Sequence, residues 1–235
     1  SKIEVNSEGR PPILIPKPPD IQVHPITGKE MIRIPAGDFL YGHNKEKRYL
    51  PEFWIAKTPV TNAEYALFVT ATGYRGLAHW LGWLKKSPKD EKLNHPVVNI
   101  SWHGAQLYAK WANCKLPTEE EWEKAARGTD GHIYPWGNSW QEKHCNTREA
   151  GIGTTSPVGQ FSPLGDSPYG CVDMVGNVWE WTSGKGLEVS GTRVVRGGSW
   201  LNRQAYTYSR LGFDGPGRKS KDLGFRLVSP ISSDF

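Results

Sequence analysis

The chain of 235 residues has a formal net charge of +5, and its 37% hydrophobic and 11% aromatic residues suffice for one core. Its 26 glycines and 18 prolines indicate many turns and exclude a long helical bundle. No apolar run reaches the roughly 18–20 residues of a membrane span, and lysines and arginines do not cluster as they do in a nucleic-acid groove. We therefore expect no membrane span and no nucleic-acid partner.

Three cysteines, Cys114, Cys145 and Cys171, lie far apart and form no CxxC pair. This spacing argues against a zinc knuckle and against a disulfide-rich secreted scaffold. It favours reduced thiols and a cytoplasmic rather than a secreted protein.

Residues 1–29 contain the run PPILIPKPPD and few side chains that could build a core. Proline fixes φ and removes a hydrogen-bond donor, so we expect an extended Pro-rich arm or linker there and one domain over residues 30–235. Alternating apolar residues predict strands over 31–42 and 52–60. Thr61 and Glu64 then form a capping box, which predicts the start of a helix.

Two further helices can be read from their caps. Ser101 can cap the helix WHGAQLYAKWAN, and Thr118 with Glu121 makes a second capping box in LPTEEEWEKAARG, which ends at Gly128. The second half of the chain is rich in turns, with short strands expected in SPVGQF, RVVRGGSW and LGFRLVS. Helices in the first half and strands in the second predict an α+β fold.

Eight segments taken in order carry a family likeness: IPAGDFLYG, KTPVTNAEYALFV, HPVVNISWHGAQLYAKWA, KLPTEEEWEKAARG, YPWGN, GCVDMVGNVWEW, RVVRGGSW and LGFRL. With these segments the chain resembles the formylglycine-generating enzyme, or sulfatase-modifying factor, superfamily over about residues 31–228. The resemblance implies an α+β fold of the C-type-lectin-like kind with much irregular structure, often containing calcium.

The copper oxidases of that superfamily have one cysteine three residues after the serine of GGS and another five residues later. Here Ser199 is followed at those positions by Asn202 and Thr207. Amide and hydroxyl oxygens are hard donors that do not hold Cu(I), so no copper is expected. A formylglycine-generating oxidoreductase, or another enzyme of this superfamily, is therefore the alternative rather than the preferred function. The seven histidines are dispersed, which argues against the histidine cluster of the related iron enzymes.

The resemblance also implies a structural calcium site in DMVGNVWE. Its ligands would be the side chains of Asp173 and Glu180 and the carbonyls of Gly176 and Val178, since hard cations prefer oxygen ligands. The alternative is that Asp173 and Glu180 cap turns or pair with an arginine such as Arg196.

A second calcium site is implied at Asn146 and Thr147, with an acid and a carbonyl downstream. Ala150 stands where the acid is expected, so the neighbouring Glu149 and the carbonyl of Ile152 would complete the set. Both sites would be structural.

Residues 200–222 (WLNRQAYTYSRLGFDGPGRKSKD) mix tyrosine with small polar residues, as antibody paratopes do. This composition predicts a noncatalytic surface for a protein or peptide ligand, whereas Tyr206 and Tyr208 could alternatively pack within a half-buried strand. Composition and position also resemble the variable proteins of diversity-generating retroelements, which end in a diversified segment. The expected binding residues are Trp200, Asn202, Gln204, Tyr206, Tyr208, Phe213, Asp214, Arg218 and Lys219.

Overall fold

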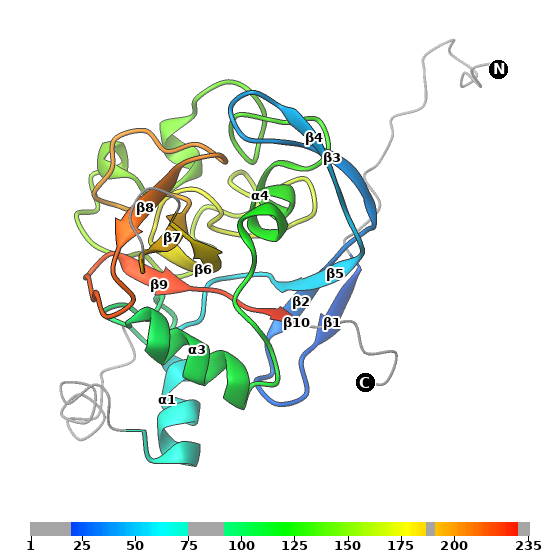
Figure 1. The fold of residues 1–235 in the computed structure, drawn as a ribbon. Helices are drawn as coiled ribbons and strands as arrows, with labels where there is room; N and C mark the ends of the chain where they lie inside the picture. The colour runs from blue at the N-terminus through cyan, green and yellow to red at the C-terminus, as the bar shows by residue number, and fades with distance from the viewer. Residues whose placement is uncertain (1–19, 75–91, 187–190, 230–235) are drawn as a thin grey trace, which may run out of the picture.

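The computed structural model describes residues 20–74, 92–186 and 191–229, with the side chains of residues 212–214 left out (Figure 1). One antiparallel sheet has the strand order β1-β2-β5-β10, formed by Ile21–Val23, Glu30–Ile34, Phe53–Ala56 and Val228–Ser229. The first and last described strands are thus the two edges of one sheet.

The domain begins earlier than the sequence indicates. Strand β1 pairs with β2, and the side chain of Lys29 is buried, where its Nζ donates to Pro59 O and Glu64 Oε2. Residues 20–29 therefore belong to the folded unit. The sequence does not indicate this, because a short edge strand needs few apolar residues. The remainder of the expected arm, residues 1–19, lies outside the described residues.

The single strand expected over residues 31–42 is in fact two strands. Strand β2 ends at Ile34, and β3 (Gly37–Tyr41) turns away to form a separate hairpin with β4 (Glu46–Leu50). Pro35 lies at the break, where a residue without an N–H cannot continue a paired strand.

The third sheet has the order β8-β7-β6-β9, formed by Arg210–Asp214, Arg193–Arg196, Trp179–Lys185 and Leu223–Phe225. Strands β6 and β9 run parallel, and the other pairs are antiparallel. Segment 200–222 is therefore the loop after β7, all of β8 and the turn before β9. The strand expected in SPVGQF is absent from the described chain, which forms turns over residues 158–165.

The expected caps are present at all three helices. Helix α1 (Asn62–Thr72) begins at the Thr61–Glu64 box, α3 (Trp102–Trp111) at Ser101, and α4 (Glu119–Arg127) at the Thr118–Glu121 box. Two short 3₁₀ turns follow, η2 (Glu142–His144) and η3 (Arg148–Ala150). Within the described ranges, each helix is too short or too polar to cross a membrane.

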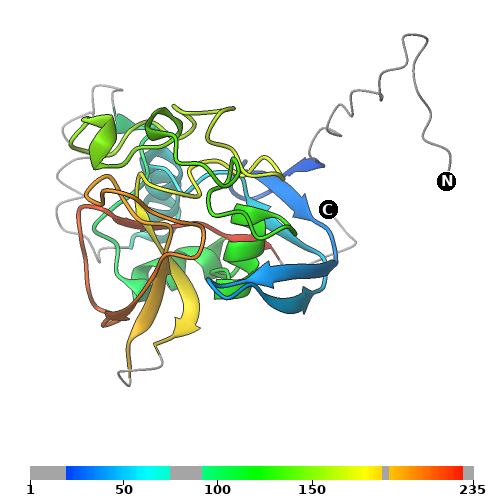
Figure 2. The same cartoon turned by 90° about the horizontal axis from the view of Figure 1, so that it is seen from above.

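Helices α1 and α3 pack against each other below strand β9 (Figure 1). Their aromatic side chains form the larger core, in which the rings of Tyr65 and Tyr108 stack at 5.7 Å and both meet Phe225. Helix α4 lies between the β3–β4 hairpin and the sheet that holds β6 and β7 (Figures 1 and 2). Its Trp122 is fully buried, so α4 joins two sheets and can position the loop that follows β7.

Candidate binding face

The two positions that correspond to copper-binding cysteines are occupied by side chains with structural hydrogen bonds. Asn202 Oδ1 accepts from Ser199 N at 2.9 Å. Thr207 is fully buried, and its hydroxyl donates to His132 O at 2.8 Å. Both side chains hold the loop in place, and neither offers sulfur to a soft metal.

A row of aromatic rings lies beside this loop. Tyr206 and Tyr208 stack at 5.2 Å with an interplanar angle of 4°, and Tyr134 and Trp136 stack at 5.4 Å and 5°. The two pairs meet where Tyr134 and Tyr206 approach to 5.7 Å, and His43 closes the row 5.3 Å from Tyr208. We call these five residues the aromatic row. It joins the β3–β4 turn, the 131–140 loop and segment 200–222.

Burial raises the pKa of Tyr134 and of Tyr208 above the ordinary range for a phenol. Their hydroxyl groups therefore stay protonated at neutral pH and can donate hydrogen bonds. Tyr134 is only 5% exposed, so it supports the row from within, and the half-buried Trp136, Tyr206 and Tyr208 present neutral, amphipathic rings.

Helix α4 holds this loop through a buried carboxylate. Glu123 is fully buried and accepts from Arg127 Nη1 at 2.7 Å and from Arg196 Nη2. Arg196 Nη2 also donates to Thr207 O at 3.2 Å, and the Arg127 guanidinium lies 5.5 Å from the Tyr208 ring centroid. One buried glutamate thus fixes two arginines that contact successive parts of the loop.

The other expected binding residues are spread along the segment. Gln204 is exposed and accepts from Tyr206 Oη at 3.1 Å, while Arg218 and Lys219 are exposed on the turn before β9. Trp200 is only 8% exposed, so it belongs to the scaffold rather than to the contact surface. The side chains of Phe213 and Asp214 lie outside the described residues.

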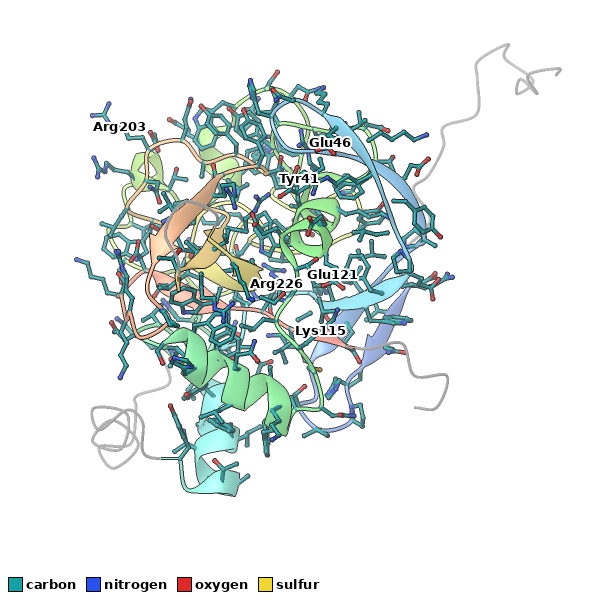
Figure 3. All side chains as sticks on the ribbon, viewed as in Figure 1. Tyr41, Glu46, Lys115, Glu121, Arg203 and Arg226 are labelled. Atoms are coloured by element: carbon teal, nitrogen blue, oxygen red, sulfur yellow. The ribbon has the colours of Figure 1, made fainter. Side chains whose placement is uncertain are left out.

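The first expected calcium set is engaged in other contacts. Both oxygens of the buried Glu180 accept from Arg226 at 2.7 Å, and Oε2 also accepts from Trp122 Nε1 at 2.7 Å (Arg226 is labelled in Figure 3). Asp173 Oδ2 accepts from Gly159 N at 3.1 Å. A carboxylate has about four acceptor positions, of which Glu180 uses three, and Arg226 balances its charge. This geometry fits calcium poorly at Glu180.

The other two expected ligands of the first set are the backbone carbonyls of Gly176 and Val178, and both residues are buried. The arginine that pairs with Glu180 is Arg226 and not Arg196, which pairs with Glu119 and Glu123. Within the described ranges, no three His, Cys, Asp or Glu side chains are grouped so that they could hold a metal ion.

The second calcium set has one feature that suits a hard cation. Asn146 is 1% exposed, and its Oδ1 has no hydrogen-bond partner, although its Nδ2 donates to Thr154 O at 2.9 Å. Thr147 is fully buried, its hydroxyl donates to the exposed Glu149, and Ile152 is half-buried. A buried carbonyl oxygen without a donor is costly unless water or a cation satisfies it, so this set fits calcium better than the first.

The three cysteines are free and unsuited to metal binding as they stand. Burial raises the pKa of Cys114 and of Cys145 to about 12, and that of Cys171 to about 11. The thiolate is the metal-binding form, and these thiols are protonated at neutral pH.

The profile of the sulfatase-modifying factor enzyme 1-like domain matches residues 17–231. The chain belongs to this family. An inactive C-alpha-formylglycine-generating enzyme 2 from Bos taurus is 42% identical, over 85% of this chain and 87% of the relative. A formylglycine-generating enzyme from Streptomyces coelicolor is 31% identical, over 90% of this chain and 92% of the relative.

Two solved structures have a fold similar to that of this chain. PvdO from Pseudomonas aeruginosa has a TM-score of 0.72 at 22% identity, covering 92% of this chain and 99% of its own. Treponema denticola variable protein 1 has a TM-score of 0.68 at 21% identity, covering 90% of this chain and 99% of its own. The expected α+β fold of the C-type-lectin-like kind is confirmed.

Sequence reasoning found the loop but missed its supports. His43, Tyr134 and Trp136 complete the aromatic row, and Glu123 and Arg127 lie beneath it. YPWGN marked two of these residues only as family motif, and the glutamate and arginine of α4 resemble ordinary helix surface charges. No local pattern connects His43 with Tyr208.

Proposed function

We propose that this protein is noncatalytic and binds a protein or peptide ligand on the face formed by the aromatic row and the exposed residues of segment 200–222. The observation that carries the proposal is the chemistry at Asn202 and Thr207. Both side chains use their polar atoms to hold the loop, so the position of the copper site contributes scaffold and no reactive group. The 42% identity to an inactive relative agrees with this reading.

The aromatic row suits binding for an energetic reason. Its rings already rest on one another, so little side-chain freedom is lost when a ligand covers them. Tyrosine and tryptophan supply large contact areas at low entropic cost, and exposed polar residues such as Gln204 supply adaptable hydrogen bonds. These are the properties of a paratope.

The test of the noncatalytic proposal is a Cu(I) titration against a chromophoric chelator, followed by oxygen uptake with a cysteine-containing peptide. The Streptomyces coelicolor formylglycine-generating enzyme is the positive control. We expect this protein to take no copper from the chelator and to consume no oxygen above background, because its thiols are protonated at neutral pH. One tightly bound copper per chain together with oxygen uptake would return it to the oxidoreductases.

A diversified binder is the more specific form of the same function. In segment 200–222, Arg203 and Arg218 are exposed, whereas Thr207 and Asp222 are buried and hydrogen-bonded. The segment thus separates positions that can vary from positions that must hold the loop, which is what diversification requires.

Calcium remains a proposal, and we place it at Asn146, Thr147, Glu149 and Ile152. It would act structurally by satisfying Asn146 Oδ1. We expect calcium to raise the melting temperature of the EDTA-treated protein, since a ligand that binds only the folded state stabilises it. Asn146→Ala should lose this response and Asp173→Asn should keep it; the reverse pattern would place the ion at Asp173.

A further inference from the structure

The two ends of segment 200–222 meet at one point. Ser199 Oγ donates to Asp222 Oδ2 at 2.8 Å, and Asn202 Oδ1 accepts from Ser199 N at 2.9 Å. A third segment, the 3₁₀ turn η3, is bonded to them, because Arg148 N donates to Asn202 O at 2.8 Å. Residues from η3, from the loop after β7 and from the turn before β9 therefore meet at Ser199 and Asn202.

Three basic residues lie next to this contact. Arg148 is bonded to Asn202 through its backbone, Arg203 follows Asn202, and Lys221 precedes Asp222, and all three are exposed. We call them the cationic corner. Figure 3 shows Arg203 at the outer edge of the molecule with its side chain directed away from the ribbon. Lys221 Nζ lies 5.0 Å from the Trp200 ring centroid.

Within the part of the chain that the structure describes, no carboxylate forms an ion pair with any of these three side chains. Asp222 is 8% exposed and is held by Ser199 and Ser220. Glu149 is exposed but offsets at most one of the three charges. Among the described residues, the corner therefore carries an excess of positive charge.

We propose that the ligand of this face is an acidic segment of a protein or peptide, whose carboxylates bind the cationic corner while its apolar side chains cover the aromatic row. This inference rests on the proposed function. Guanidinium groups bind carboxylates with two parallel hydrogen bonds, and exposed cations steer an acidic partner toward the face. The corner and the row are continuous, because Arg203 adjoins Gln204, which is bonded to Tyr206.

A nucleic acid would also be attracted by arginines next to aromatic rings, but the row is poorly arranged for bases. Tyr206 and Tyr208 stack on each other at an interplanar angle of 4°, as do Tyr134 and Trp136 at 5°. Single-stranded nucleic acids bind such residues by stacking bases on free ring faces. Rings that already cover one another favour contact with side chains along their edges.

The experiment is a selection from a displayed library of random 12-residue peptides against the whole chain. Enriched peptides are then measured by fluorescence anisotropy against wild type, Arg203→Glu, and the double variant Tyr206→Ala/Tyr208→Ala. Lys110→Glu is the matched control, since it makes the same charge change at an exposed position in the last turn of α3, whereas segment 200–222 contacts the first turn, where Trp102 N donates to Pro216 O. Melting curves confirm that every variant is folded.

We expect peptides that need Tyr206 and Tyr208 to be rich in Asp and Glu. Their binding should weaken about tenfold in Arg203→Glu, should weaken with added salt, and should change little in Lys110→Glu. Tyrosine-dependent peptides that are neutral or basic would overturn the acidic ligand and leave the proposed function standing. A selection that yields no tyrosine-dependent peptide would overturn both.

Two further outcomes would also overturn the acidic ligand. If Lys110→Glu weakened peptide binding as much as Arg203→Glu does, the loss would reflect the net charge of the protein and not a contact at the cationic corner. Displacement of the enriched peptides by a 12-nucleotide single-stranded DNA at a similar concentration would point to a nucleic acid instead.

Discussion

At the level of single residues, the ion pair between Glu180 and Arg226 joins β6 to the chain that follows β9. Arg226 is fully buried and also donates to Ala56 O at 3.1 Å and to Val172 O at 2.9 Å. Its guanidinium thus connects β5, the loop before β6, and β6 itself. The carboxylate of Glu180 supplies the negative charge that balances this buried guanidinium.

We predict that Glu180→Gln lowers the free energy of unfolding by about 3–5 kcal/mol, because it leaves a buried guanidinium without its counter-charge. Urea unfolding followed by tryptophan fluorescence measures the loss. Asp38→Asn is the control, since Asp38 and Lys47 form an exposed ion pair and we expect no measurable change there. A loss in Glu180→Gln that disappears once calcium is removed from both proteins would show instead that Glu180 acts as a calcium ligand.

At the level of elements, the loop that follows β7 depends on Gly198, which lies two residues after the end of that strand. Gly198 has φ +75°, and a Cβ there would lie 2.4 Å from Ala205 Cβ. The chain must pass this close to Ala205 for the loop to reach Asn202 and Thr207. The glycine is therefore a requirement of the binding face and not only of the turn.

Gly198→Ala should destabilise the protein by about 2 kcal/mol or more, since both the positive φ and the contact with Ala205 oppose a methyl group. Gly217→Ala lies in the same segment, has open space around its Cβ position and should change the melting temperature little. Thermal unfolding of the two variants decides the matter. Equal melting temperatures would mean that the loop can shift, and that the aromatic row is less firmly positioned than its contacts imply.

At the scale of the whole molecule, the parts that sequence predicts well are local. Capping boxes such as Thr61–Glu64 bring together residues three positions apart, so their pattern is visible in the chain itself. The supports of the binding face depend on contacts between distant segments, such as His43 with Tyr208. Apolar residues alternate on both sides of Pro35, so the alternation predicts one strand where the structure has two, β2 and β3. Family motifs identified the fold because they sample the whole chain in order.

The diversified form of the proposed function makes a prediction about the gene as a whole. The neighbouring DNA should contain a reverse transcriptase gene and a near-identical template repeat that differs at adenines. The structure adds where the differences can fall: in codons for exposed side chains, such as Arg203 and Gln204, and not in those for Thr207 or Asp222, whose bonds close the loop. Thermal unfolding of two variants tests this separation of positions. Gln204→Ser should leave the melting temperature nearly unchanged, and Thr207→Ala should lower it. Differences concentrated at Thr207 and Asp222, or DNA without a template repeat, would leave an undiversified binding protein, since the aromatic row does not depend on variation.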